Sequence, residues 1–120
     1  MIEPGTTRWT AQDAAEFYDV PRWGHGFFSV RDAGHILVHP DRPPDRSVDM
    51  KELVDMLQLR GLDLPILLRF NGILKDRLRE LHDVFANAIR DNNYRGNYAC
   101  VYPIKVNQQR EVVEKIVEYG

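Results

Sequence analysis

Apolar residues are distributed differently in the two parts of the chain. Up to about residue 47 they form short runs between glycines and prolines, as in GFFSVRDAGHILVHP. Phe28 and Val30 would share one face of a strand. Residues 32–34 would supply a turn and residues 36–38 the return strand, so this run predicts a β-hairpin. Because a lone hairpin is marginally stable in water, we expect its strands to join a larger sheet.

A short helix is predicted ahead of the hairpin, and a linker after it. Thr10 is a suitable N-cap for a helix over about residues 11–18, which Pro21 would end. Residues 40–47, PDRPPDRS, are rich in proline and charge and indicate a loop or linker.

From residue 48 onward, apolar residues recur at the spacing of three and four that is typical of helices. One helix would begin near Ser47 or Asp49, with Asp49 and Glu52 in capping-box spacing, and Gly61 would stop it. Asn71 would cap the next helix, and a last one begins near residue 108. The inward positions of these last two helices are Ile73, Leu74, Leu78, Leu81, Val84, Phe85, Ala88, Ile89, Val112, Val113, Ile116 and Val117.

Two apolar runs between these helices predict strands. Residues 64–70, LPILLRF, show no alternation, as in a parallel strand covered on both faces, and residues 98–106 are rich in Val, Ile and Tyr. Alternating helices and strands predict an α/β fold with parallel strands, as at the start of a (β/α)8 barrel. A complete barrel needs about 200 residues or more. We therefore expect residues 48–120 to be an incomplete piece of one, preceded by residues 1–47 as part of a β-rich domain.

Composition narrows the possible partners. The chain has 120 residues, 43% of them apolar, and a net charge of −2, which gives no reason to expect nucleic acid or an anionic membrane as partner. No apolar run approaches the roughly 20 residues of a membrane helix. Cys100 is the only cysteine, which excludes an intrachain disulfide and a cysteine-cluster metal site, and the cytoplasm is the expected compartment.

Lys105 stands at the C-terminal end of the second predicted strand, where barrels carry their reactive groups. Lysine is rarely buried. A lysine surrounded by Tyr, Val and Ile therefore either extends its aliphatic stem to water or has a functional role for its amine. A lysine amine can form a Schiff base with an aldehyde, as pyridoxal phosphate chemistry requires. The amine reacts when deprotonated, a state that apolar neighbours such as Val101, Ile104 and Val106 favour.

The residues around Lys105 resemble a known family. The string VYPIKVNQ, residues 101–108, and the charged helix after it are similar to the pyridoxal-lysine segment of the biosynthetic arginine decarboxylases, in the alanine-racemase-like group of pyridoxal enzymes. The resemblance continues upstream through RWGHGFFSV, DAGHILV and LPILLRF. Ornithine and diaminopimelate decarboxylases also carry an Asn two residues after the lysine, but they lack the YPIKVNQQR and WGHGFF strings.

The resemblance implies that the chain is the N-terminal part of an enzyme that decarboxylates L-arginine to agmatine and CO2 in polyamine synthesis. Lys105 would be the catalytic residue and would hold pyridoxal phosphate through a Schiff base. The family also implies Mg²⁺, for which no ligand can be placed, and a homodimer or homotetramer. The phosphate loop, the acidic partner of the pyridine nitrogen and the substrate clamp would follow Gly120, so we expect the chain alone to be inactive.

Four further residues each have two possible roles, and a fifth has no explanation in the sequence. Asn107 either orients the lysine or caps the next helix, and we favour the cap. Tyr102 and Cys100 either line the barrel or pack in its interior, and we favour packing. Arg69, at the end of the other predicted strand, faces the active-site mouth or is a solvated turn residue, which we favour. Pro103 removes one hydrogen bond from a strand, and the composition does not explain it.

The histidines raise the question of a metal site. His35 and His39 share a face of the return strand, with His25 across the hairpin. No carboxylate pattern reinforces them, so we predict ordinary exposed histidines and no metal ligand. His82, on the long helix, is expected at the surface.

Three functional classes are consistent with the residues. The first is part of an arginine decarboxylase, with another basic amino-acid or diaminopimelate decarboxylase of the same fold as its alternative. The second is a non-catalytic module that binds pyridoxal phosphate or a protein partner. The third is a structural α/β domain in which Lys105 is incidental; normal activity of a Lys105→Ala parent would favour it.

Overall fold

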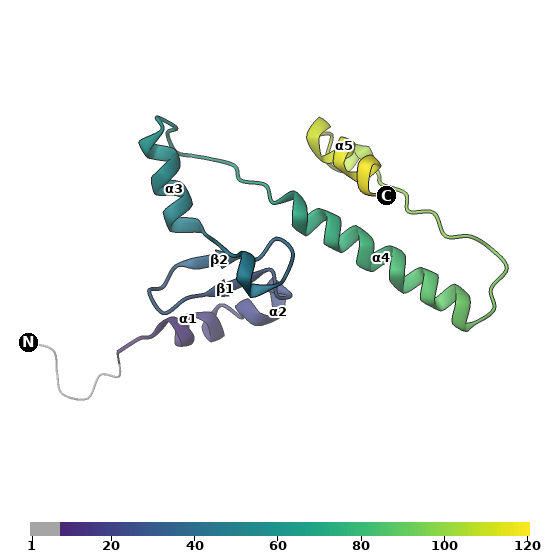
Figure 1. The fold of residues 1–120 in the computed structure, drawn as a ribbon, viewed down its shortest axis with the longest axis horizontal. Helices are drawn as coiled ribbons and strands as arrows, with labels where there is room; N and C mark the ends of the chain where they lie inside the picture. Colours follow the sequence, from purple (N-terminus) through teal and green to yellow (C-terminus); the bar gives the residue numbers. More distant parts are fainter. Residues whose placement is uncertain (1–7) are drawn as a thin grey trace, which may run out of the picture. The chain divides into compact units, whose positions relative to one another are not determined.

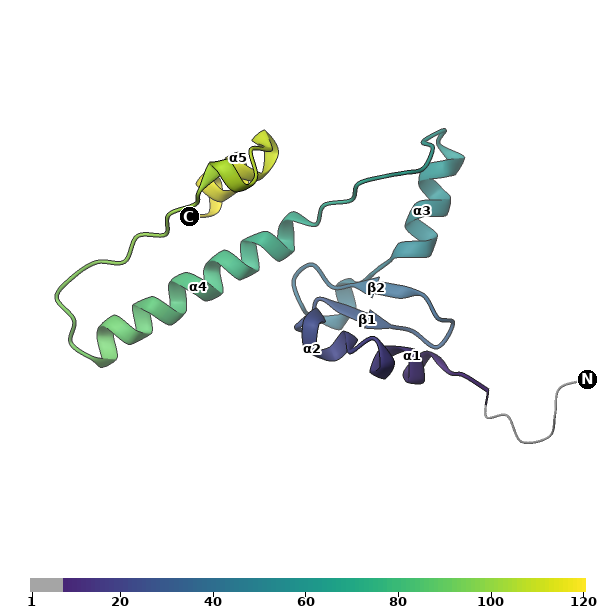
Figure 2. The same ribbon diagram turned by 180° about the vertical axis from the view of Figure 1, so that it is seen from behind.

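The computed structural model describes residues 8–120, apart from the side chain of Pro44. The chain forms two compact units, Met1–Leu68 (unit 1) and Arg69–Gly120 (unit 2), which are described separately. The ribbon is drawn from opposite sides in Figures 1 and 2. No described helix is both long and apolar enough to cross a membrane.

Unit 1 contains a three-stranded antiparallel sheet in the order β1-β2-β3, of which β1 and β2 are labelled in Figure 1. β1 (Phe28–Val30) and β2 (Ile36–Val38) form the predicted hairpin, with Phe28 opposite Val38. Its turn contains Gly34 with a φ of +81°, a backbone conformation that suits glycine. β3 (Val48–Asp49) pairs with β2, so the prediction that the hairpin joins a larger sheet is confirmed.

Three helices surround this sheet. α1 (Ala11–Phe17) starts at Thr10, whose side chain forms the capping box with Asp13. α2 (Val20–Gly24) follows at once, and both helices contact β1. α1 therefore ends before Pro21, which lies in the first turn of α2; the prediction that this proline ends the helix was wrong, because proline is well tolerated there.

α3 (Met50–Leu59) contacts β2 and β3, and its N-cap is Asp49, one of the two predicted starts. The Asp49 side chain accepts hydrogen bonds from the amides of Lys51 and Glu52. Gly61, with a φ of +83°, follows the helix, as predicted for its stop. The linker before α3 contains a single 3-10 turn, Pro44–Arg46.

The core of unit 1 is small. Its buried hydrophobic residues are Val20, Phe27 and Val38, and Val38 is fully buried.

The predicted division after residue 47 differs from the division after Leu68 that the structure shows. The reason is that β3 and α3, assigned from the sequence to the second part, pack on the hairpin and belong to unit 1.

Unit 2 consists of two helices joined by an extended segment. α4 (Asn71–Asp91) contacts α5 (Arg110–Tyr119), and the segment between them runs back along α4 (Figures 1 and 2). Asn71 is the first residue of α4, and the N-cap position is Phe70, so the predicted Asn71 cap was wrong. None of residues 69–120 is buried. Val117, predicted to face inward, is 76% exposed.

The two strands predicted around residues 64–70 and 98–106 are not formed. Both segments are extended without a ladder, and Ile104–Val106 form a 3-10 turn, which we call the Lys105 turn. A strand exists only when a neighbour satisfies its backbone hydrogen bonds. Within residues 8–120 no such neighbour is present: Leu67 is 74% exposed and Val101 is 83% exposed. The start of a (β/α)8 barrel therefore stays a prediction.

Candidate functional site

Lys105 is the middle residue of the Lys105 turn and is exposed. Within the described part of the chain, its amine has no hydrogen-bond or ion-pair partner. The expected apolar surroundings are not supplied by these residues, because Val106 is 75% exposed and Ile104 is 52% exposed. The amine is thus available for reaction, and any apolar cover over it would have to come from outside the described chain.

The backbone around Lys105 is held by three hydrogen bonds. The Val106 amide donates to the Pro103 carbonyl, with the nitrogen and oxygen 3.0 Å apart. The Tyr102 hydroxyl donates to the Asn107 carbonyl across the turn, 3.2 Å. The Asn107 Oδ1 accepts from the Gln109 amide, 3.1 Å. Since Gln109 is the N-cap position of α5, Asn107 supports the entry to that helix and is not itself the cap we predicted.

Pro103 has a role that the sequence did not reveal. It is the residue before the Lys105 turn, with a φ of −78°, within the range that its ring imposes. Its carbonyl accepts the bond that closes the turn, and it needs no amide hydrogen there. Because proline cannot donate a ladder hydrogen bond, Pro103 was a signal against the continuous strand that we had predicted.

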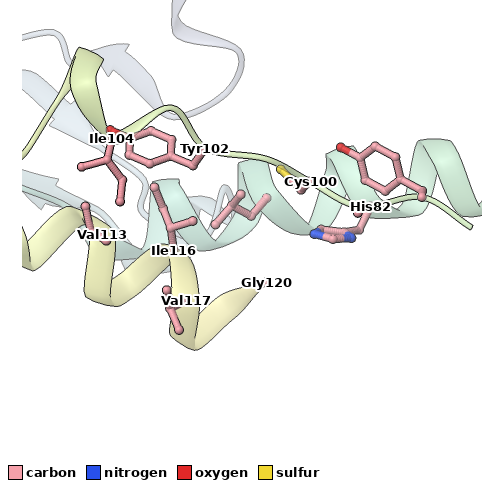
Figure 3. A pocket seen from close by; sticks show the side chains of 11 residues that line it. His82, Cys100, Tyr102, Ile104, Val113, Ile116, Val117 and Gly120 are labelled. Atoms are coloured by element: carbon pink, nitrogen blue, oxygen red, sulfur yellow. The ribbon is translucent and has the colours of Figure 1, made fainter.

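A cavity of about 530 Å³ adjoins the Lys105 turn (Figure 3). α4, the extended segment and α5 all contribute to its wall, mainly with apolar side chains. Tyr102 is half-buried in the cavity wall, and its predicted packing in a barrel interior stays a prediction. Cys100 also lines the cavity but is exposed, and Arg69 is exposed as expected.

His82 is more enclosed than predicted. His82 is half-buried, and the centre of its ring lies 5.5 Å from the centre of the Tyr98 ring in an edge-on arrangement. Its Nε2 is buried without a hydrogen-bond partner in the described structure. Tyr98 also stacks on Phe85, with the ring centres 4.1 Å apart. Burial, helped by a hydrogen bond with Cys100, raises the pKa of the Tyr98 hydroxyl. The extended segment folds back onto α4, which brings these rings together.

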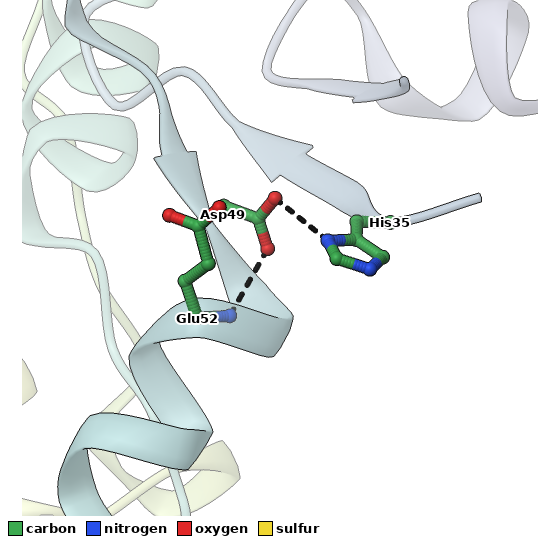
Figure 4. Close-up of side chains that lie close together, drawn as sticks. All are labelled: His35, Asp49 and Glu52. Atoms are coloured by element: carbon green, nitrogen blue, oxygen red, sulfur yellow. Dashed lines mark hydrogen bonds and ion pairs between the residues drawn. The ribbon is translucent and has the colours of Figure 1, made fainter. Parts of the chain in front are cut away.

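His35 takes part in a polar cluster that the sequence analysis missed (Figure 4). Its Nδ1 donates to Asp49 Oδ2, 2.9 Å away, and Glu52 lies alongside. The ligand atoms of these three residues lie within 4.8 Å of one another, which is close enough for a metal ion. Arg31 Nη1, however, lies 2.8 Å from Asp49 Oδ2 and 3.3 Å from Glu52 Oε1. A cation is therefore already present between the carboxylates, and we interpret the cluster as an ion-pair network.

We predicted no carboxylate pattern near the histidines, and this was wrong for His35, because Asp49 and Glu52 reach it only when α3 folds onto the sheet. It was also wrong that all these histidines are exposed. His39 is buried, with its Nε2 2.7 Å from the Ser29 hydroxyl. His25 is exposed as predicted.

Asp49 is the centre of this network. Burial alone would raise the pKa of its carboxyl, since the side chain is only 6% exposed. Hydrogen bonds from the Glu52 amide, His35 and Arg31 outweigh burial and hold that pKa well below its usual range. The ionised carboxylate thus joins the hairpin to the start of α3.

Replacing Asp49 with asparagine is expected to lower the melting temperature of unit 1 near neutral pH. The melting temperature of this variant should also decrease less than that of the wild type as the pH falls. The folded-state pKa is depressed, so the stabilisation is complete above the unfolded pKa of about 3.9 and is lost as the pH falls toward the folded value. Thermal melts at several pH values, followed by tryptophan fluorescence, measure this. Asp32→Asn, an equal charge change in the exposed hairpin turn, is the control; equal acid profiles of the two variants would contradict the assignment.

Comparison with known proteins places this geometry in context. No protein-family model matches the chain. It is 63% identical over 114 residues to the biosynthetic arginine decarboxylase of Rhodopirellula baltica, covering 95% of this chain and 17% of that protein. The corresponding enzymes of Aeromonas hydrophila and Gloeobacter violaceus are 48% and 46% identical, over 92% and 93% of the chain. The chain spans only 18% and 17% of their lengths. The predicted resemblance is therefore confirmed: almost all of the chain is similar to one segment of the biosynthetic arginine decarboxylases.

Proposed function

We propose that the chain is the N-terminal part of a longer enzyme that decarboxylates L-arginine, with Lys105 as the residue that holds pyridoxal phosphate. The observation that carries this proposal is the identity of 63% over 95% of the chain to a biosynthetic arginine decarboxylase. The accessible amine of Lys105, without a partner among residues 8–120, supports the assignment of the residue.

The described residues fit one part of a pyridoxal phosphate site. Lys105 Nζ would hold the aldehyde carbon, and the Lys105 turn presents this amine to solvent. Neither a glycine-rich phosphate loop nor an acidic partner for a ring nitrogen lies at the Lys105 turn in the described chain. Those groups, and the residues that bind the substrate guanidinium and carboxylate, would come from the remainder of the longer polypeptide.

The reaction converts L-arginine into agmatine: the bond from the α-carbon to the carboxylate breaks, CO2 leaves, and a proton is added to the α-carbon. The cofactor, when bound, supplies an electron sink for the pair left at that carbon. The contribution of this chain is to hold the lysine amine at a fixed place through the Lys105 turn. Fixed placement of reacting groups is a major source of rate enhancement.

The test compares the complete protein with the 120-residue chain. With pyridoxal phosphate and carboxyl-labelled L-arginine, the complete protein is expected to release CO2 over many turnovers, whereas the chain alone releases none. Ornithine and diaminopimelate serve as competing substrates. If the complete protein decarboxylated either of them faster than arginine, that amino acid would be the substrate instead of arginine. Sustained release by the 120-residue chain, or none by the complete protein with any of the three, would contradict it.

A further inference from the structure

The Tyr102 hydroxyl forms a clamp across the residue proposed to hold the cofactor. The Lys105 turn has a single backbone hydrogen bond of its own, from the Val106 amide to the Pro103 carbonyl. Short 3-10 turns with so few bonds are weakly held. The bond from Tyr102 Oη to the Asn107 carbonyl closes a wider loop around the turn, so that Lys105 lies inside two nested hydrogen bonds.

Both ends of this clamp are anchored. The Tyr102 ring lies in the wall of the cavity with Val113 and Ile116 of α5 (Figure 3). Its backbone precedes Pro103, which restricts it to extended conformations. At the other end, the Asn107 Oδ1 accepts a hydrogen bond from the Gln109 amide at the entry to α5. The Tyr102 hydroxyl thus ties the start of the Lys105 turn to Asn107, which supports the entry to α5.

On the basis of the proposed function, we propose that Tyr102 is a positioning residue for Lys105. Its hydroxyl does not contact the reacting atoms; it narrows the range of directions that the lysine stem can take from the Lys105 turn. A hydrogen bond of this kind contributes a small net free energy, which corresponds to about a fivefold change in the population of the held conformation. Loss of the hydroxyl should therefore weaken cofactor attachment at Lys105 by about fivefold without changing the amine itself.

The experiment uses the complete protein freed of cofactor. Pyridoxal phosphate is titrated in, borohydride traps the adduct, and peptide mass spectrometry measures the labelled fraction of Lys105. Tyr102→Phe keeps the ring and removes only the hydroxyl, and about fivefold more cofactor is expected for half-labelling. Tyr98→Phe removes a hydroxyl from the same cavity wall that has no bond to the Lys105 turn, so wild-type labelling is expected. Replacing Tyr102 with 4-aminophenylalanine restores a donor and should restore labelling.

A second readout separates orientation from reactivity. Trinitrobenzenesulfonate modifies any accessible amine, and its reaction at Lys105 relative to Lys51 of unit 1 should be the same in Tyr102→Phe and wild type. If Tyr102→Phe and the wild type needed the same cofactor concentration for half-labelling, the inference would be overturned. It would also be overturned if the trinitrobenzenesulfonate reaction at Lys105 changed together with cofactor labelling, because that would indicate altered reactivity or folding. Labelling of the wild type at a residue other than Lys105 would overturn the proposed function instead, so the two failures are distinguishable.

Discussion

Replacing Lys105 with alanine in the complete protein is expected to lower the rate of arginine decarboxylation by about a thousandfold or more. Lys105 is the proposed covalent attachment point of the cofactor, and removing a positioned catalytic group commonly costs about a hundred- to ten-thousandfold in rate. The Lys105 turn exposes this amine without a competing partner among the described residues. Decarboxylation is measured as released CO2 at saturating cofactor.

Two control variants make this result specific to the amine. Lys105→Arg keeps the positive charge but cannot form the imine, and it should be as inactive as the alanine variant. Lys51→Ala removes an exposed lysine of unit 1, which is paired with Asp55, and should leave the rate unchanged. Normal turnover by Lys105→Ala would show that the lysine is incidental and would favour the structural α/β domain considered above.

Replacing Phe27 with alanine is expected to destabilise unit 1 by about 3–5 kcal/mol, as large-to-small changes of buried aromatic residues do. Phe27 is 3% exposed and is one of the three buried hydrophobic residues of the described chain. The Arg42 guanidinium lies over its ring, 4.7 Å from the centre, and would lose this contact too. With so small a core, the variant should be largely unfolded near room temperature.

Chemical denaturation followed by tryptophan fluorescence tests this expectation. The chain has two tryptophans, Trp9 and Trp23, and both lie in unit 1, so the signal reports on that unit alone. Leu59→Ala is the control, because Leu59 also lies in unit 1 but is 90% exposed, and its truncation should cost about 0.5 kcal/mol or less. Equal denaturation midpoints for the two variants would contradict the assigned core.

The local signals in the sequence predicted the local structure well. Thr10 and Asp49 act as helix caps, Gly34 lies in the hairpin turn and Gly61 follows α3, because each of these roles depends on residues within about four positions of one another. The string around Lys105 also identified the relatives of the chain. A motif is a property of the sequence alone and needs no folded structure to be read.

The tertiary structure decided the features that join distant residues. Arg31 and His35 reach Asp49 only when α3 packs on the sheet, and His82 meets Tyr98 only when the extended segment turns back along α4. The runs around Leu67 and Val101 have strand composition but form no ladder in the described chain, since a strand's hydrogen bonds belong equally to its neighbours. Side-chain preferences act along the chain and are visible in the sequence, whereas pairing depends on which segments fold against each other in space.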